Sequence, residues 1–387
     1  TPGGQTKIGS YYILNILYTF WIKLMTNNVE IKTIWLRSEF RSTERRTPLL
    51  ASGAKELLEI GYNVVVERSK NRIIDDYEYE AVGCEMVDAG RWVSPPSDAL
   101  ILGLKELPDE PALIKNTHIL FAHAYKEQAG WKKMLNRFVK GGADLLDIEY
   151  MTKKDGMRYV AFGYRAGYMG AALTLLHWNS IHQGGAKFLD NSLVPFENAD
   201  LLDKAIDKLS KGVEKPRVLI IGAGGRCGSG AADIYERHGA SITRWDWEDT
   251  IDIDRHVVSD HDIMINCAFI KSKGSPFIRK QDILTGTRLS IIADVGCDPF
   301  SDFNPMPIYS EPTSWDKPYI KVAGENAKSV DLIAIDNLPS LLPRESSEEF
   351  AELMLPHLKV LNNRNNEQPW RSAKASFDDA ITRMKNS

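Results

Sequence analysis

Residues 215–231 read Lys-Pro-Arg-Val-Leu-Ile-Ile-Gly-Ala-Gly-Gly-Arg-Cys-Gly-Ser-Gly-Ala, and this stretch decides the fold. The aliphatic run Val218–Ile221 is typical of a strand that is buried on both faces. Glycines follow directly, and a helix is predicted to begin behind them. Backbone amides at such a strand–loop–helix junction bind a pyrophosphate. We therefore assign these residues to a dinucleotide site: Gly222, Gly224, Gly225, Arg226 and Gly228.

A second predicted strand, Ser241–Trp245, ends in Asp246, whose carboxylate would accept hydrogen bonds from an adenosine ribose. This placement favours NAD over NADP. The glycine spacing departs from the usual fingerprint because Cys227 stands at the third position, so a merely tight turn is the alternative. Arg244 has two interpretations, a contact to a 2′-phosphate or a solvated surface charge, and we expect the second.

The length and charge of the chain limit the classes of protein to which it can belong. A chain of 387 residues is long enough for two domains. The net charge of −4, without a basic stripe, makes nucleic acid a poor partner and favours small-molecule chemistry. The four cysteines lie far apart without metal-ligand spacing, which argues against zinc and against a secreted disulfide scaffold. We expect no metal site, and a reducing compartment.

The first 28 residues precede the regular pattern. The apolar run Tyr11–Met25 is broken by Asn15 and Lys23. One interpretation is a short membrane anchor, although the run is marginal in length and lacks a small-residue cleavage site. We prefer the other interpretation, in which residues 1–28 are an extraneous or disordered segment, and we expect no membrane association.

From residue 29 onward, short apolar runs alternate with helical patterns, which predicts parallel sheets. In the first part of the chain, strands are expected at Ile31–Leu36, Asn63–Glu67, Asp98–Leu104, His118–Phe121 and Leu145–Tyr150, and helices from Thr47 to near Gly61 and over Trp131–Val139. In the second part, Ile263–Cys267 and Leu289–Asp294 are further strands.

Two helical patterns organise these parts into domains. Residues 163–183 are rich in Gly, Ala and Leu, as in a close-packed helix that connects two domains. The pattern over Ser347–Val360 predicts a helix that returns to the first domain. We predict an α/β protein with two Rossmann-like domains, whose parallel sheets are separated by an active-site cleft. The domains are 29–162 plus 347–387 for substrate and catalysis, and 163–346 for NAD.

Lys105 and His123 end neighbouring predicted strands, so both are expected at the carboxyl edge of one sheet, facing the cleft. A hydride-transfer enzyme needs such a proton acceptor beside the carbon that is oxidised. A second cation disfavours the charged form of each group. Considered alone, each residue has an equally good alternative interpretation. Lys105 would be a solvated charge, and His123 would be a histidine of the core. Glu149 would balance the positive charge, or else is a surface carboxylate.

Several cations lie near the same predicted edge: Arg37, Arg41, Arg45, Arg46, Lys126 and Arg158. Guanidinium forks bind carboxylates bidentately, so this set suits a substrate with several carboxylates. The alternative for the arginine group is a solvated basic face.

With these residues placed, the chain resembles the fungal-type saccharopine dehydrogenases that form L-lysine, relatives of the alanine dehydrogenase and transhydrogenase group. The resemblance runs from about Ile31 to the C-terminus. It is carried by Arg-Ser-Glu at 37–39, Glu-Arg-Arg-Thr-Pro at 44–48, Gly-Leu-Lys-Glu at 103–106, Phe-Ala-His-Ala-Tyr-Lys-Glu-Gln-Ala-Gly-Trp at 121–131, Gly-Arg-Cys-Gly-Ser-Gly-Ala at 225–231 and Asp-Asn-Leu-Pro-Ser-Leu-Leu-Pro-Arg-Glu at 336–345.

The resemblance implies reversible, NAD-dependent oxidative deamination of saccharopine to lysine and 2-oxoglutarate, the last step of lysine biosynthesis by the aminoadipate pathway. It implies that Lys105 and His123 are the acid–base pair and that Glu149 tunes their charge. It also implies substrate-binding roles for Arg46, Lys126 and Arg158, and cofactor-binding roles for the glycine loop, Asp246 and Asp336.

Some features depart from the family or remain open. The family usually has lysine where this chain has Arg41, which keeps the charge with a different reach. Cys227 and Cys267 match family cysteines that can form a disulfide. The C-terminal Lys385-Asn386-Ser387 is not a peroxisomal signal, so we expect a cytoplasmic enzyme. We also expect a monomer, with a small homo-oligomer as the alternative. The alternatives are an alanine-dehydrogenase-like enzyme and a non-catalytic NAD-binding protein.

Overall fold

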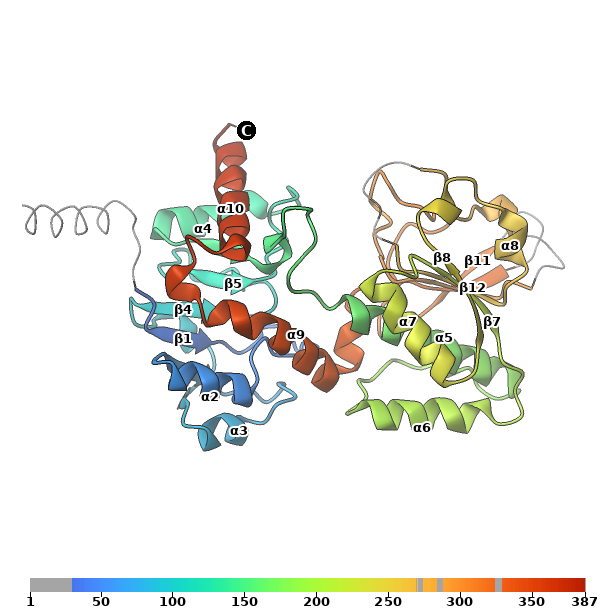
Figure 1. Cartoon of the computed structure of the whole chain (residues 1–387), viewed down its shortest axis with the longest axis horizontal. Coiled ribbons are helices and arrows are strands. Elements are labelled where there is room, and N and C mark those ends of the chain that lie inside the picture. The colour runs from blue at the N-terminus through green and yellow to red at the C-terminus, as the bar shows by residue number, and fades with distance from the viewer. Residues whose placement is uncertain (1–29, 269, 271–273, 284–287, 324–328, 387) are drawn as a thin grey trace, which may run out of the picture.

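The computed structural model describes residues 30–268, 270, 274–283, 288–323 and 329–386, so the prediction for residues 1–28 lies outside the described residues. The chain forms two lobes, each built on one six-stranded sheet with helices beside it (Figure 1). This architecture confirms the predicted α/β class with two Rossmann-like sheets. Within the described residues, none of the helices has the combination of length and apolar sequence that a membrane crossing requires.

The first sheet has the strand order β3-β2-β1-β4-β5-β6, and all its pairs are parallel. Its strands are β1 Thr33–Leu36, β2 Asn63–Glu67, β3 Glu85–Val87, β4 Ala99–Leu102, β5 His118–Leu120 and β6 Leu145–Asp147. The order reverses between β1 and β4. Ligands of open α/β sheets bind beyond the carboxyl ends of the strands at such a reversal.

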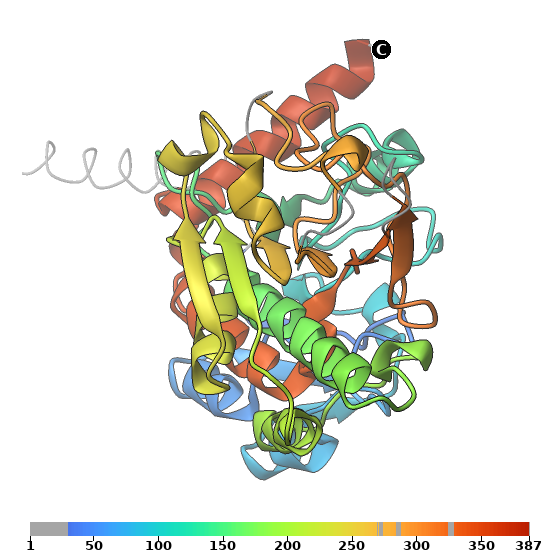
Figure 2. The ribbon, with the colours of Figure 1, turned by 90° about the vertical axis from the view of Figure 1, so that its right-hand side faces the viewer.

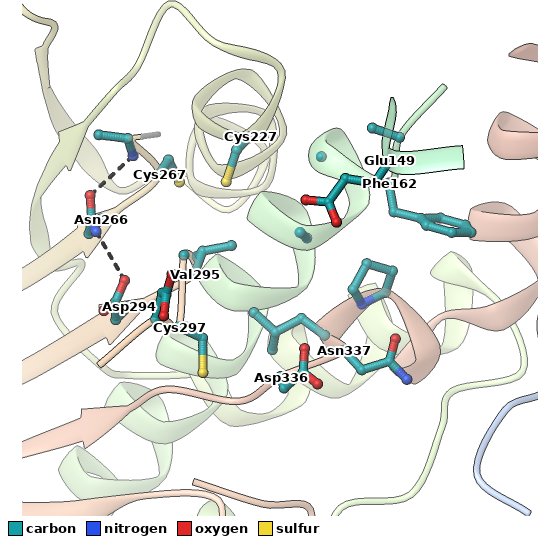
Figure 3. Close-up of a pocket in the computed structure, with 18 of the residues that line it drawn as sticks. Glu149, Phe162, Cys227, Asn266, Cys267, Asp294, Val295, Cys297, Asp336 and Asn337 are labelled. Carbon is teal, nitrogen blue, oxygen red and sulfur yellow. Dashed lines mark hydrogen bonds between the residues drawn. The ribbon is translucent and has the colours of Figure 1, made fainter. Parts of the chain in front are cut away.

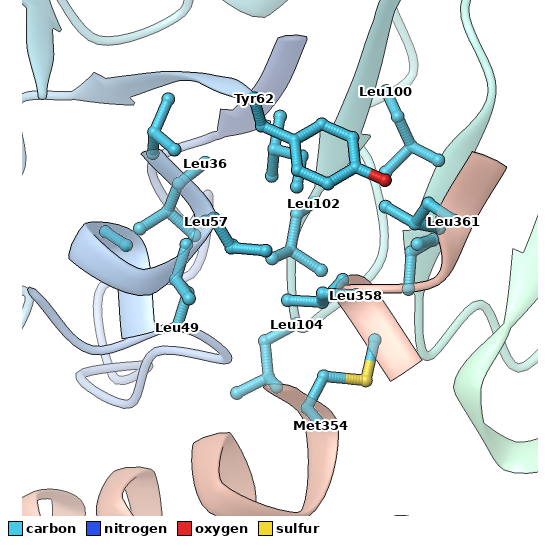
Figure 4. Packing of buried hydrophobic residues seen from close by; sticks show 14 of the residues in the cluster. Leu36, Leu49, Leu57, Tyr62, Leu100, Leu102, Leu104, Met354, Leu358 and Leu361 are labelled. Atoms are coloured by element: carbon cyan, nitrogen blue, oxygen red, sulfur yellow. The ribbon is translucent and has the colours of Figure 1, made fainter. Parts of the chain in front are cut away.

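The helices of the first lobe come from both ends of the described chain. They are α2 Ala51–Glu59, α3 Asp76–Ala81, α4 Trp131–Gly141, α9 Pro343–Leu358 and α10 Gln368–Asn386. On one face of the sheet, Leu57 from α2 and Met354 from α9 pack against Leu102 of β4 (Figure 4). On the other face, Phe138 from α4 and Phe377 from α10 share a core. The C-terminal helices therefore complete the first lobe.

The second sheet has the order β11-β12-β10-β9-β7-β8. Its strands are β7 Arg217–Ile221, β8 Ser241–Trp245, β9 Ile263–Asn266, β10 Ile291–Asp294, β11 Ile320–Ala323 and β12 Ser329–Ile333. The expected parallel pairing holds except at the edge, where β11 runs antiparallel to β12. The helices of this lobe are α5 Gly163–His182, α6 Ala199–Ser210, α7 Arg226–Arg237 and α8 Arg255–Ser259.

Helix α5 begins where the first lobe ends and runs beside the strands of the second lobe (Figure 2). It packs closely on α7, because a Cβ at Gly167 would lie 1.8 Å from the carbonyl oxygen of Cys227. The small residues of this segment therefore have the close-packing role that the sequence predicted. This contact holds the start of α7 against the connection between the lobes.

Several predicted elements have different bounds in the structure, among them α9, which begins at Pro343 instead of Ser347, and two elements whose ends have a clear physical cause. The strand expected at Leu145–Tyr150 ends at Asp147, since a side-chain oxygen of Asp147 accepts the N–H of Glu149 at 2.9 Å and starts a 3₁₀ turn. The helix expected from Thr47 begins only at Ala51. The amide of Thr47 instead donates to the hydroxyl of Ser347 at 3.0 Å, which ties this segment to α9. Short 3₁₀ turns lie at Arg91–Val93, Ile148–Tyr150, Phe188–Asp190, Glu248–Thr250, Lys280–Asp282, Leu338–Leu341 and Leu361–Asn363.

Candidate active site

A cavity of about 590 Å³ is lined by residues of both lobes (Figure 3). From the first lobe come Arg46, Lys105, His123, Lys126, Glu149, Arg158 and Phe162; from the second come Arg226, Cys227, Asn266, Cys267, Asp294, Cys297, Asp336 and Asn337. The cavity therefore gathers most of the residues that the sequence assigned to acid–base chemistry and carboxylate binding. In the close-up, Asp336 and Asn337 lie across the cavity from Glu149.

Lys105 and His123 reach this cavity because β4 and β5 are neighbours in the sheet, with Ile101 paired to His118. The loops after the two strands thus leave the sheet side by side, as predicted. Lys105 is buried, with 9% of its surface exposed, whereas His123 is exposed. His123 adopts a left-handed backbone conformation with φ of 51°, which is uncommon for a residue with a side chain.

The surroundings of the two groups favour their neutral forms. Burial lowers the pKa of Lys105 from its ordinary value, and the nearby Arg46 charge lowers it further against the opposing effect of Asp336. Although His123 keeps an exposed surface, partial burial in the cavity wall and the charge of Lys105 likewise lower its pKa, against the opposing effect of Glu149. Each group therefore releases its proton more readily than it would in water.

Glu149 holds two of the predicted carboxylate-binding cations. Its Oε1 accepts a hydrogen bond from the ammonium of Lys126 at 3.0 Å and lies 4.0 Å from a guanidinium nitrogen of Arg158. Although burial alone would raise the pKa of Glu149, these cations lower it below its ordinary value. The carboxylate is thus ionised near neutral pH and already shares the cations that a substrate carboxylate would meet.

Arg46 is fixed from three sides. Its guanidinium binds the buried Glu44 bidentately at 2.8 and 2.6 Å, stacks 4.1 Å from the ring centre of Phe162, and donates to the side-chain oxygen of Asn337. The sequence reasoning missed these three partners. The acidic residue two positions before Arg46 was the available signal for Glu44, but the pattern did not show that it is buried.

Arg37 and Arg41 differ from Arg46 in their placement. Arg41 pairs with Glu106 and is not among the residues that line the cavity. Arg37 is only 2% exposed, so it belongs to neither a solvated basic face nor the cavity wall. Its guanidinium turns inward because backbone carbonyls of the loop after β4 accept its hydrogen bonds.

The glycine loop after β7 has the shape that a pyrophosphate needs. Gly222 has φ of +81°, and α7 begins at Arg226 directly behind the loop. A Cβ at Gly228 would lie 2.2 Å from the carbonyl oxygen of Gly222, so only glycine lets the helix approach the loop this closely. The first amides of α7 have no partner within a helix, and they suit a phosphate group. These residues therefore fit NAD.

Asp246 lies beside the same loop. Its carboxylate accepts the amide N–H of Gly224 at 2.9 Å, so the acid that follows β8 and the glycines that follow β7 meet at one edge of the second sheet. Arg244 pairs with Glu236 at 2.5 Å on an exposed surface, in keeping with the expected surface charge. Asp336, the other acidic residue that the resemblance assigns to the cofactor, lines the cavity.

Three cysteines line the cavity, and all are free thiols in this structure. Burial and a hydrogen bond with Cys227 raise the pKa of the Cys267 thiol, so the two sulfurs are neighbours. Cys297, which the sequence did not single out, has φ of 48° and donates from its thiol to the carbonyl oxygen of Ala334 at 3.0 Å.

Known proteins share this architecture. The family described as Alanine dehydrogenase/PNT, N-terminal domain, matches residues 35–169. An L-alanine dehydrogenase structure superposes with a TM-score of 0.66 at 16% identity, covering 91% of this chain and 99% of that one. A transhydrogenase from Sinorhizobium meliloti gives a TM-score of 0.55 at 15% identity, covering 86% of this chain and 95% of that one. At such identities the likeness shows the fold alone.

Other known proteins resemble this chain more closely in sequence. Proteins named saccharopine dehydrogenase [NAD(+), L-lysine-forming] match at 41% identity in Emericella nidulans, with 91% of this chain and 98% of that protein covered. The same name is carried by relatives at 41% in Yarrowia lipolytica, covering 90% and 97%, and at 36% in Schizosaccharomyces pombe, covering 91% and 99%. The chain belongs to the family of NAD-dependent, L-lysine-forming saccharopine dehydrogenases.

Proposed function

We propose that this protein catalyses the reversible, NAD-dependent oxidative deamination of L-saccharopine to L-lysine and 2-oxoglutarate. The observation that carries the proposal is the placement of Lys105 and His123, two groups with lowered pKa values, in one cavity with Arg46. The names of the fungal relatives supply the substrate and cofactor.

In the proposed reaction, bound NAD+ supplies the hydride acceptor. Lys105 and His123 serve the proton transfers on the substrate side. One proton leaves the protonated secondary amine before hydride leaves the glutarate-side carbon. The water that adds to the resulting imine carbon loses both of its protons, the first on addition and the second when the carbonyl forms. The nitrogen of the departing lysine takes one proton up when the carbon–nitrogen bond breaks. Since the lowered pKa values favour the neutral bases, a larger share of each residue can accept these protons at a given pH than if the group were in water.

The binding assignments are also part of the proposal. Arg46, Lys126, Arg158 and, from outside the cavity lining, Arg41 would bind substrate carboxylates. The cofactor would lie along Gly222, Gly224, Gly225, Arg226, Gly228, Asp246 and Asp336. Glu149 would limit the positive charge around His123. We further propose the division into domains 29–162 plus 347–387 and 163–346, a monomer, and a cytoplasmic location.

The direct test is NADH consumption with lysine and 2-oxoglutarate, run beside NADPH and beside pyruvate with ammonia. We expect turnover with the first set alone. Turnover with pyruvate and ammonia would instead indicate an alanine-dehydrogenase-like enzyme. NADH binding without turnover on either set would favour a non-catalytic protein.

Substituting the proposed acid–base pair tests the roles of its members. We expect Lys105→Met and His123→Gln each to lower kcat by about 10²-fold or more, the usual scale of general acid–base help. NADH affinity, measured by fluorescence titration, should stay close to that of the unsubstituted protein because neither residue belongs to the glycine loop. Full activity in both variants would overturn the assignment.

A further inference from the structure

The segment Arg37-Ser38-Glu39 follows β1 at the point where the strand order of the first sheet reverses. The proposed reaction gives it no task. Nonetheless, two of its charged side chains are almost completely withdrawn from solvent, with 1% of Arg37 and 7% of Glu39 exposed. Buried charges require partners, so their contacts indicate what they do.

Glu39 binds the backbone at Lys105. Its two carboxylate oxygens accept the amide N–H groups of Leu104 at 2.7 Å and Lys105 at 3.0 Å. Two consecutive amides of the loop after β4 are therefore held by one carboxylate. Burial raises the pKa of this carboxyl group, whereas the Arg37 charge and the two amides favour its ionised form, which accepts stronger hydrogen bonds than a neutral group.

Arg37 binds the same residue from the carbonyl side. Its Nη2 donates to the carbonyl oxygen of Lys105, and it also lies 3.2 Å from a carboxylate oxygen of Glu39. The charges of Arg37 and Glu39 thus neutralise each other. Together the two side chains hold both the N–H and the C=O of Lys105. A Cβ at Gly103 would lie 2.3 Å from Nε of Arg37, so glycine there leaves the space that the guanidinium occupies.

A second buried carboxylate holds the segment in turn. Both the amide and the hydroxyl of Ser38 donate to Oε2 of Glu67 at 2.9 Å. Glu67 has no exposed surface and also accepts N–H groups from Trp35 at 3.1 Å and Gly90 at 3.0 Å. The segment is therefore fixed to β2 and to the loop after β3, independently of its contacts with Lys105.

We propose that Arg37 and Glu39 are positioning residues that clamp the backbone of Lys105, with Ser38 and Glu67 as the anchor of the clamp. The inference rests on the proposed acid–base role of Lys105. A lysine side chain is long and flexible, so the direction in which its ammonium enters the cavity depends on a fixed backbone. A displacement of about 1 Å at a reacting group can cost about 10²-fold in rate.

The clamp also maintains the electrostatic setting of Lys105. The charged groups that act on this ammonium are Arg46, Asp336, Glu44 and Arg41, and its own charge acts on His123. If the loop loosens, Lys105 gains solvent and moves away from these neighbours. Its pKa then rises toward the ordinary value, and so does the pKa of His123 as the neighbouring charge withdraws.

The test compares Glu39→Gln, Arg37→Lys and Gly103→Ala with the unsubstituted enzyme, using NADH, lysine and 2-oxoglutarate. The first removes the charge of the carboxylate, the second shortens the donor, and the third displaces Arg37 without removing a charge. We expect kcat to fall by about tenfold to 10²-fold and NADH affinity to stay within about twofold in all three variants. In Arg37→Lys and Gly103→Ala, which retain both charges, the limbs of the pH–rate profile should move to higher pH.

The matched control is Arg137→Lys. Arg137 is also buried in the first lobe, its Nε donates to the carbonyl oxygen of Pro111 at 2.9 Å, and it does not line the cavity. We expect this control to lose stability without a shift in its pH profile. If Glu39→Gln does not fold, Gly103→Ala retains both charges and carries the test. Lower activity with an unshifted profile in folded Arg37→Lys and Gly103→Ala would overturn the clamp, whereas an inactive unsubstituted protein would overturn the proposed function itself.

Discussion

At the scale of single residues, the site is a balance of charges around Lys105 and His123. Arg46 and Lys105 repel additional positive charge, while Glu149 and Asp336 attract it. Each substitution that alters one charge should therefore move a measurable pKa in a direction that the arrangement fixes.

Glu149→Gln gives the clearest change of this kind. The Glu149 carboxylate raises the pKa of His123, against burial and Lys105, which lower it. Without that negative charge, the pKa of His123 should fall further below its ordinary value of 6.5. We expect the limb of the kcat/KM profile that belongs to His123 to move to lower pH. An unchanged limb, or one moved to higher pH, would contradict the assignment of that limb to His123.

The residue scale also shows where the sequence could be interpreted and where it could not. Lys105 and His123 were predictable because each follows an aliphatic run, and the ends of adjacent parallel strands meet at one edge of the sheet. The opposite orientations of Arg37 and Arg46 were not predictable. Both follow the same strand in a basic stretch, and only the packed loops decide which guanidinium faces the interior and which faces the cavity. The burial of Glu44 depends on the same packing.

At the scale of elements, α10 contributes more than a face of the core. Near its end, Arg383 donates from Nη1 to the Glu127 carboxylate at 2.6 Å and from Nη2 to the carbonyl oxygen of Tyr125 at 2.9 Å. This loop carries His123 and Lys126, and both His123 and Glu127 have positive φ. The C-terminal helix therefore supports an unusual backbone that leads directly to the cavity.

Arg383→Met should weaken that support. Because the ion pair is partly exposed, its loss is worth at most about 1 kcal/mol, or about fivefold in kcat/KM for 2-oxoglutarate. Steady-state kinetics, together with a melting curve, provide the measurement. Lys374→Met is the matched control, since Lys374 lies on the same helix and pairs with Asp378 and Asp144, away from the loop. Equal losses of activity in both variants would indicate a general effect of the helix.

Some features of the helices and strands could also be predicted from the sequence. The glycine- and alanine-rich run of α5 indicated close packing, and the structure gives α7 as its partner. The ends of the short strands were harder to predict. Asp147 ends β6 by capping a 3₁₀ turn with its own side chain, and nothing in the aliphatic pattern of 145–150 distinguishes that turn from a longer strand.

At the scale of the whole molecule, two of the polar contacts that join the lobes involve proposed ligand-binding residues. Arg46 donates to Asn337, and Arg226 at the start of α7 donates from Nη2 to the carbonyl oxygen of Arg158 at 3.1 Å. The second contact joins the proposed pyrophosphate site to the loop that carries a proposed carboxylate-binding arginine. A guanidinium has five donors, so Arg226 can keep this contact while it also binds a phosphate.

This contact predicts that cofactor and substrate assist each other in binding. NADH would fix Arg226 and, through it, the backbone at Arg158, so 2-oxoglutarate should bind a preformed site. Because such coupling is reciprocal, 2-oxoglutarate should tighten NADH by the same factor, about fivefold or more on the usual scale of coupling energies. Fluorescence titration of NADH with and without 2-oxoglutarate measures that factor directly.

In Arg226→Met the factor should approach one, whatever the loss in NADH affinity. Asp246→Ala is the control, because it should weaken NADH through the ribose and leave the factor intact. A factor that survives in Arg226→Met would place the coupling elsewhere, with the Arg46–Asn337 contact as the next connection to test.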